Sequence, residues 1–288
     1  MTGGGTQRGT TLGVGENRFG RVGLGVLAWV VGIVWVFPVG WTVFTSFKSE
    51  QDATAQTLKH GLSLGRYHEV SSSTEGTLSL ATAFSNSVFV VLVSTVIVML
   101  LALPAAYALA IRRVPKWRDI LFFFISTKFL PVVASIFPIY VYAEKWNLIG
   151  TRTILVVLYT AMNLPLAVWM IRSFFMEVPR ELVEAAEIDG TKFINQLRSV
   201  ILPISAPGIA ATALLCVIFA WNEYFYAIQL NFANGSTMPQ WVIGNVDTRG
   251  NFLAKLSAAS VIACLPVVVA GWIAQKRMIR GLSMGAIK

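Results

Sequence analysis

The stretch EAAEIDGTKFINQLRSVILP, residues 184–203, is polar and lies between two long apolar runs, at 153–174 and 204–228. The chain as a whole is very apolar, since 55% of its 288 residues are hydrophobic and only 13% are charged. Such a composition is too apolar for an ordinary soluble domain. It indicates a membrane protein in which residues 184–203 connect two spans outside the bilayer.

Six apolar runs are long enough to cross the membrane as helices, because a hydrocarbon core about 30 Å thick requires ~20 mostly apolar residues per helix. The runs cover residues 22–46, 86–111, 119–143, 153–174, 204–228 and 257–275. Pro131, Pro138 and Pro165 lie within the third and fourth runs, where we expect kinks. The sequence therefore predicts an all-α polytopic fold with six transmembrane helices.

The distribution of Lys and Arg sets the expected orientation, because positively charged loops remain in the cytoplasm. With the N-terminus inside, the cytoplasmic segments hold most of the Lys and Arg residues. Both termini and the polar stretch are then cytoplasmic, and the net charge of +9 needs no nucleic acid partner. We expect a disordered tail at 1–20, a transmembrane domain at 21–279 with its polar loop at 177–203, and a cytoplasmic tail at 280–288. The outer, Ser/Thr-rich segment 47–85 can pack as a small cap.

The polar loop has the pattern of two short helices joined at a glycine. Pro179 is typical of a helix start, and good helix formers continue to Ile188 before the turn signal Asp189-Gly190. A second helix is expected to begin near Thr191 and to end before Pro203. One side of both helices can dock on a neighbour, because small or apolar residues recur at steps of three or four. These residues are Val183, Ala186, Gly190, Phe193, Leu197 and Val200.

A passive loop lying on the lipid headgroups is the alternative, and it would favour Lys and Arg on the polar side. The first half of the loop is acidic instead, which anionic lipids repel. Its acidic residues are Glu177, Glu181, Glu184, Glu187 and Asp189. The composition therefore favours docking on a cytoplasmic protein.

The spacing of Glu184-Ala185-Ala186, Gly190 and Ile201-Leu202-Pro203 resembles the signature loop of ABC importer permeases, position by position. Three other segments are similar to the second permease of carbohydrate importers: SLGRY at 63–67, WNEY at 221–224 and RGLSMGAIK at 280–288. The resemblance extends from about residue 20 onward. The family that the chain resembles is the binding-protein-dependent transport system inner membrane component, in its maltose/polyol-like type. Its members have the type I ABC importer permease fold.

In that family the loop is a coupling helix that sits in a cleft of the cytoplasmic ATPase subunit. The resemblance implies coupling roles for Glu184, Ala185, Ala186, Asp189, Gly190, Leu202 and Pro203. It implies four kinds of partner in the cytoplasmic membrane of a prokaryote: a homologous second permease, an ATPase dimer that carries ATP and magnesium, an extracytoplasmic solute-binding protein, and a sugar or polyol. Thr191 stands where the family often has alanine, which is a mild departure.

No nucleotide-binding loop is present in the chain, because the sequence contains no Gly-Lys pair. The histidines are His60 and His68, both in the outer segment, and no His-Glu-x-x-His motif occurs. We therefore expect no catalytic residues, cofactor or metal in this chain, and we assign ATP hydrolysis to a partner.

Polar residues within the spans are candidates for the translocation path, since a charge near the bilayer centre costs ~2.5–3.5 kcal/mol and usually lines a cavity. Lys128 and Asn163 are expected at similar depths, in the third and fourth spans. Asn222 and Glu223 are expected toward the outer end of the fifth span, beside aromatic residues that suit a sugar ring.

Several alternatives remain open at this point. Lys128 and Glu223 can instead form a structural ion pair or contact the second permease, and Asn163 can bond a kinked backbone. The chain can also be a channel or a secondary transporter that uses Lys128 and Glu223 as a charge relay, although such a protein does not need the acidic loop. A membrane enzyme is the weakest alternative. The segment Ser126 to Pro131 resembles polyol importers more than maltose importers.

Overall fold

The computed structural model describes residues 18–72, 79–112, 114–129, 131–230, 236–246 and 252–285, and within these ranges every regular element is a helix. The long helices are α1 (Arg18–Ser46), α4 (Leu80–Ala110), α7 (Arg152–Met176), α10 (Leu202–Trp221) and α13 (Leu253–Gly285). The shorter ones are α2 (Glu50–Ala55), α3 (Gly65–Ser72), α5 (Trp117–Ser126), α6 (Val132–Lys145), α8 (Arg180–Ile188), α9 (Phe193–Gln196), α11 (Phe225–Leu230) and α12 (Met238–Gly244). A 3₁₀ turn, η1 (Thr127–Phe129), follows α5, and a π-helical segment, η2 (Leu197–Ile201), joins α9 to α10.

Five helices are long and apolar enough to cross a membrane, and α5 with α6 gives a sixth span if that bent pair counts as one. The six-span prediction is therefore confirmed in outline. Most of the predicted tail at 1–20 lies outside the described residues, and α13 continues to Gly285.

The third predicted span, 119–143, is not one kinked helix, because its two halves are bent by 90°. The side chains of Ser126 and Thr127 hydrogen-bond to carbonyl oxygens three residues earlier and end the first half in a 3₁₀ turn. Pro131 then caps α6, where its missing N–H costs no helical hydrogen bond. We expected a kink within one helix, and the structure has a break between two helices.

The fifth predicted span, 204–228, begins and ends earlier than expected, because the apolar helix extends over Phe193–Trp221. The second loop helix does not stop before Pro203, which lies in the first turn of α10. The π-helical segment before it has a wider turn, in which the Leu202 N–H bonds to the Leu197 carbonyl, and this accommodates the proline. The loop is therefore continuous with a membrane span.

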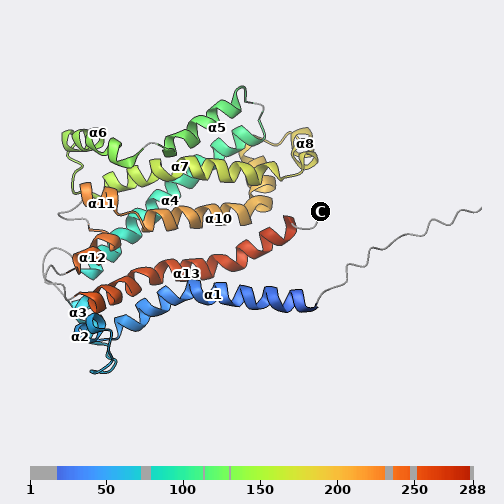
Figure 1. Cartoon of the computed structure of the whole chain (residues 1–288). Helices are drawn as coiled ribbons and strands as arrows, with labels where there is room; N and C mark the ends of the chain where they lie inside the picture. The colour runs from blue at the N-terminus through green and yellow to red at the C-terminus, as the bar shows by residue number, and fades with distance from the viewer. Residues whose placement is uncertain are drawn as a thin grey trace, which may run out of the picture.

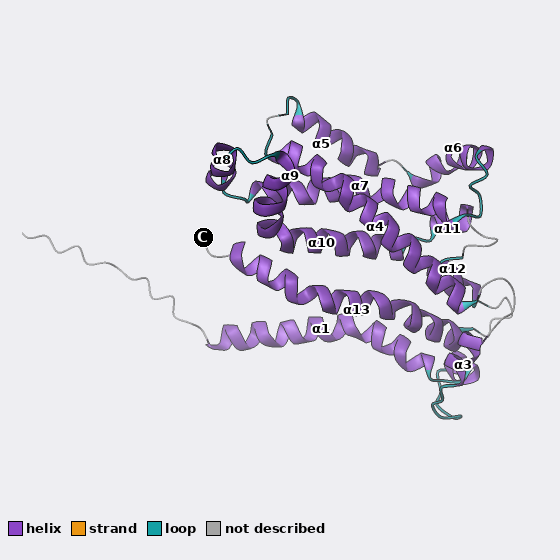
Figure 2. Cartoon of the chain, turned by 180° about the vertical axis from the view of Figure 1, so that it is seen from behind, coloured by secondary structure: helices purple, strands orange, loops and turns teal. Residues whose placement is uncertain are grey.

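The helices form two groups (Figure 1). α4, α7 and α10 pack against one another in the centre, whereas α1 packs chiefly on α13. In the most apolar 18-residue stretch of α1 no residue is buried by the rest of the chain, whereas half of the corresponding stretch of α7 is buried. α1 begins and α13 ends at the end of the bundle that carries α8, and Figure 2 shows the same arrangement from behind. We call this end the α8 end and the opposite one the α2 end.

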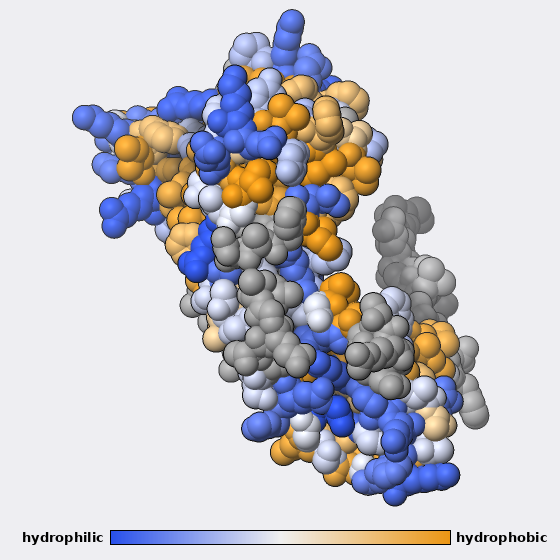
Figure 3. Space-filling view, turned by 90° about the vertical axis from the view of Figure 1, so that its left-hand side faces the viewer, coloured by the Kyte–Doolittle hydropathy of each residue, from blue (hydrophilic) through white to orange (hydrophobic). Residues whose placement is uncertain are grey.

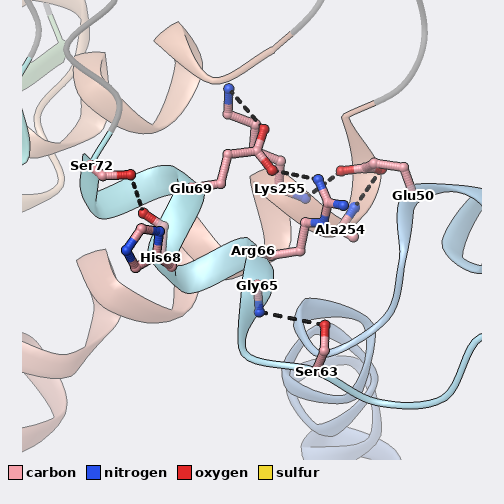
Figure 4. Close-up of polar contacts among 9 residues, drawn as sticks. All are labelled: Glu50, Ser63, Gly65, Arg66, His68, Glu69, Ser72, Ala254 and Lys255. Carbon is pink, nitrogen blue, oxygen red and sulfur yellow. Dashed lines mark hydrogen bonds and ion pairs between the residues drawn. The ribbon is translucent and has the colours of Figure 1, made fainter.

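Of the segment 47–85 that was predicted to form a cap, residues 47–72 fold at the α2 end, where hydrophilic residues gather (Figure 3), and residues from Leu80 onward belong to α4. Glu50 joins this cap to α13, since its carboxylate accepts the backbone N–H groups of Ala254 and Lys255 at 3.0 and 2.6 Å (Figure 4). These amides belong to the first turn of α13 and have no partner within the helix. Glu69 adds ion pairs to Arg66 and to Lys255. The cap thus fixes the start of the last span.

Asp52 organises the interior of the cap. Its side chain is 1% exposed and accepts hydrogen bonds from the Thr57 hydroxyl at 2.6 Å and from the backbone amides of Lys59 and His60 at 3.0 and 2.8 Å. These bonds, that of Thr57 first, hold the pKa of Asp52 well below its usual value. The carboxylate therefore remains charged and keeps residues 57–60 folded over α2.

The contact between α10 and α7 depends on a glycine. A Cβ at Gly208 would lie 2.2 Å from the ring carbon Cγ of Phe174. We expect Gly208→Ala to destabilise the protein by about 1–3 kcal/mol because the ring and its helix must move. Thermal unfolding of the purified protein in detergent measures the effect.

Gly271→Ala is the matched control, since a Cβ at Gly271 meets nothing within 4 Å. In a Phe174→Ala background, Gly208→Ala should cost less than in the wild type. Equal melting temperatures for the Gly208 and Gly271 variants would contradict the prediction.

Candidate functional site

The polar loop folds as a helix, a glycine turn and the start of a second helix. α8 ends where the backbone amides of Asp189 and Gly190 bond to Ala185 and Glu187. Gly190 has a φ of +70°, which glycine adopts without the strain that a Cβ introduces. Thr191 then closes the turn, because its amide and its hydroxyl both donate to the Ala186 carbonyl, at 3.1 and 2.6 Å.

Thr191 is therefore not the N-cap of the second helix, although that helix begins near it as predicted. Lys192 occupies that position at the start of α9, and it makes no side-chain capping bond. The departure from the family's alanine at residue 191 has a structural use here, since the hydroxyl gives the loop an extra hydrogen bond.

The loop has a buried side and an exposed side. Val183 and Ala186 from the predicted docking stripe are buried against the bundle, whereas Gly190 and Phe193 are exposed. Of the predicted coupling residues, Leu202 is half-buried and Ala186 is buried. The others, Glu184, Ala185, Asp189, Gly190 and Pro203, are exposed.

Sequence reasoning missed two apolar residues on the exposed side. Ile188 is 87% exposed and Ile194 is 68% exposed, so neither packs within the chain. Ile188 lies out of register with the Val183 stripe, and that mismatch was the available signal, whereas Ile194 lies four residues after Gly190 and its spacing gave no such signal. The loop therefore exposes large apolar side chains as well as the acidic residues Glu184 and Asp189.

Lys128 and Asn163 meet at one level of α7. Lys128 lies in η1, and its ammonium group donates to the Met162 carbonyl at 2.8 Å. The amide nitrogen of the adjacent Asn163 donates to the Cys216 carbonyl of α10 at 3.3 Å. Asn163 is fully buried, and its side-chain oxygen has no hydrogen-bond partner among the described residues. A polar site thus joins the broken span to α7 and α10.

Asn222 and Glu223 form a second level, at the α2 end of α10. Asn222 caps the helix with an exposed side chain that donates to Ile218 at 2.8 Å. One carboxylate oxygen of Glu223 accepts the Tyr226 N–H at 2.9 Å, and the other is buried without a partner in the described structure. A cavity of about 270 Å³ opens beside this level, and Trp221, Asn222, Tyr224 and Ser260 belong to its lining.

The structural ion pair between Lys128 and Glu223 does not form in the described part of the chain. Lys128 is bonded to a carbonyl of α7, and Glu223 lies beyond the end of α10, where it accepts the Tyr226 N–H. Asn163 bonds the backbone of a neighbouring helix, not that of its own proline kink. The proposed ion pair is therefore not seen among the described residues, Asn163 does bond a backbone carbonyl, and a contact of Lys128 or Glu223 with the second permease stays a prediction.

Two stretches, at 61–65 and 281–285, read Gly-x-Ser-x-Gly, the pattern of a hydrolase nucleophile elbow. That elbow requires a strand followed by a helix. The first stretch leads into α3 from a loop and the second lies within α13. Neither has the geometry of a nucleophile elbow, so the enzyme alternative gains nothing from them.

A profile of the family described as binding-protein-dependent transport system inner membrane component matches residues 99–281, from within α4 to the last span. The chain belongs to this family. It is a multi-pass permease subunit of an ABC importer in the inner membrane, and ATP hydrolysis belongs to a separate chain. The self-contained channel or secondary transporter is thereby excluded.

Relatives match almost the whole permease. The sulfoquinovosyl glycerol transport system permease protein of Agrobacterium fabrum is 32% identical over 88% of this chain and 89% of its own length. The trehalose/maltose transport system permease protein of Thermococcus litoralis is 30% identical over 95% of this chain and 99% of its own. The diacetylchitobiose uptake system permease protein of Streptomyces coelicolor has the same identity and coverage.

The fold is similar to that of a solved transporter. A chain in the crystal structure of a bacterial ABC transporter involved in the import of the polysaccharide alginate superposes with a TM-score of 0.70. The match covers 90% of this permease and 95% of that chain at 22% identity. The arrangement of the helices is therefore that of an ABC importer permease.

Proposed function

We propose that this permease imports a sugar or polyol. Three of its relatives are named for carbohydrate-containing solutes: sulfoquinovosyl glycerol, trehalose or maltose, and diacetylchitobiose. The cavity beside Asn222 supports the same class, since it combines the aromatic rings of Trp221 and Tyr224 with the hydroxyl group of Ser260. Sugar rings stack their apolar faces on aromatic side chains and bond their hydroxyl groups to amides.

The partners follow from the transporter class. The permease pairs with a homologous second permease and with two ATPase subunits that carry ATP and magnesium, and an extracytoplasmic solute-binding protein delivers the solute. The α8 end, where α1 begins and α13 ends, faces the cytoplasm.

The coupling role is supported by the structure of the polar loop, which exposes α8 at the end of the bundle and connects it directly to α10. α8 lies at the end of the bundle (Figure 1) and exposes Glu184, Ala185 and Ile188. Small side chains allow close approach, and exposed apolar and acidic residues suit a docking cleft that is apolar with basic edges. The loop continues without interruption into α10, so a force on α8 reaches a membrane span directly.

The translocation path follows the junction of α7 and α10. Asn222 and Glu223 lie at the α2 end, where the solute enters, and Lys128 and Asn163 lie deeper. The break between α5 and α6 brings Lys128 to α7 with an irregular backbone, which membrane proteins tolerate where protein or a water-filled cavity surrounds it. The ammonium and amide groups at this level then bond the hydroxyl groups of the passing solute as the bundle alternates between its inward-open and outward-open forms.

Gly190→Val tests the coupling role. A Cβ there meets nothing within 4 Å, so the change acts through the positive φ and costs roughly 1–2 kcal/mol of local strain. We expect an inserted, assembled complex that hydrolyses ATP but no longer transports in proteoliposomes. Gly150→Val is the matched control, because Gly150 has a φ of +77° at the other end of the molecule. Unchanged transport by the Gly190 variant would remove the coupling assignment.

Lys128→Met tests the path. Loss of a hydrogen bond from a charged group typically costs ~1.5–3 kcal/mol, so uptake should fall roughly 10- to 100-fold while assembly and basal ATP hydrolysis persist. Lys145→Met, in the last turn of α6, is the control. Equal uptake by the two variants in vesicles that contain the complete complex would show that Lys128 is not in the path.

Copurification tests the partners and identifies the solute. The complex is extracted from native membranes through a tag on this chain, and its components are identified by mass spectrometry. We expect an ATPase, a second six-span permease and a solute-binding protein, whose ligand can then be screened among sugars and polyols. Recovery of this chain alone in several mild detergents would contradict the assembly.

A further inference from the structure

Gln196 connects three helices in the interior of the α8 end. It lies on α9, and its side chain is 1% exposed. Its carbonyl oxygen accepts a hydrogen bond from the Tyr107 hydroxyl of α4. Its amide nitrogen donates to the Val183 carbonyl of α8 at 3.1 Å. One planar carboxamide therefore bonds to α4 on one side and to α8 on the other.

Tyr107 holds the α4 side of this connection rigidly. The residue is 1% exposed, and its ring packs edge-on against Phe193 of α9 with the ring centroids 4.7 Å apart. The Arg112 guanidinium lies 5.9 Å from the same ring and forms an ion pair with Glu187 of α8 at 3.6 Å. That ion pair is half-exposed, and such pairs contribute little. The buried Gln196 bonds are the stronger tie, because no water competes for them.

Few other contacts fix α8 to the bundle. Within this helix only Val183 and Ala186 are buried, and both are small side chains. The hydrogen bond from Gln196 reaches the backbone of α8 at Val183, close to the middle of the helix. Because apolar burial is slight, the orientation of α8 depends strongly on this bond and on the closing turn at Thr191.

Gln196 is also the last residue before the π-helical segment η2. Single π turns inside α-helices frequently occur at functional sites. The carboxamide therefore lies at the junction where α8, α4 and the start of α10 meet. A displacement of α8 reaches α10 along the chain and α4 through the side chain.

We propose that Gln196 and Tyr107 are positioning residues that make α8 and the adjacent end of α4 move as one body when the ATPase moves α8. The proposal rests on the coupling role of the loop. It states that Tyr107 and Gln196, which are not among the signature residues of the loop, transmit the movement of α8 to α4.

The test uses the complete complex, purified through a tag on this chain. Spin labels replace the exposed residues Leu101 of α4 and Lys192 of the loop, in a background with Cys216→Ala and Cys264→Ala. Pulsed EPR measures the distance between the labels without nucleotide and after trapping with ATP and vanadate. The wild type should show the same narrow distance distribution in both states.

Tyr107→Phe and Gln196→Met remove the hydrogen bonds and preserve most of the volume. In both variants the distance should change or broaden on trapping, and stimulation of ATP hydrolysis by the binding protein should fall roughly 2- to 12-fold, as expected for one buried hydrogen bond. Because Gln196→Met already removes the bond to Tyr107, the double variant should be no worse than Gln196→Met alone. Tyr142→Phe and Gln229→Met, exposed residues at the α2 end, are the matched controls.

A wild-type label distance that shifts on trapping would overturn the proposal without any variant. It would equally be overturned if both variants kept the narrow distance and full stimulation. Tyr107→Phe retains the ring contact with Phe193, so this variant tests the bond even if Gln196→Met fails to assemble. A wild-type preparation that contains no ATPase would instead contradict the proposed function itself.

Discussion

The absence of water in the bilayer core governs this structure, because every backbone N–H and C=O group there must find a partner within the protein. Long helices meet that requirement along their length, and the chain departs from them at few places within its spans. At the break between α5 and α6, the hydroxyl groups of Ser126 and Thr127 bond carbonyl groups of the last turn of α5. At η2 a wider turn satisfies the Leu202 N–H beside Pro203. Both departures lie where the permease carries its candidate functional residues.

The length of the apolar runs was sufficient to predict the spans, because a helix that satisfies its own backbone groups must be long enough to cross the bilayer core. The glycine turn was equally predictable, because Asp189-Gly190 after a helical run indicates a left-handed residue and Gly190 adopts one. The burial of Val183 and Ala186 followed from their spacing on one helical face. These features depend on residues that are close in sequence, so tertiary packing changes them little.

The remaining features depend on residues that are distant in sequence. Nothing near Lys128 indicates that its ammonium group bonds a carbonyl of α7, 34 positions along the chain. Tyr107 and Gln196 are 89 positions apart, and a glutamine in an apolar helix gives no sign of its two partners. The sequence also could not distinguish a kinked third span from a broken one, because prolines are compatible with both. Tertiary contacts decided each case.

The pairing of α1 with α13 has a consequence for how the chain is made. The N-terminal part of a protein is synthesised first, so α1 enters the membrane long before α13 exists. Its main packing partner begins at Leu253, and no part of its most apolar window is buried by the rest of the chain. Until α13 has been made, the rest of the chain leaves the apolar surface of α1 to be solvated by lipid. The hydrogen bonds of Glu50 to Ala254 and Lys255 then join the two ends of the chain. A truncation before α13 would leave α1 without its main packing partner, so a helix that is made late completes the packing of one that is made early.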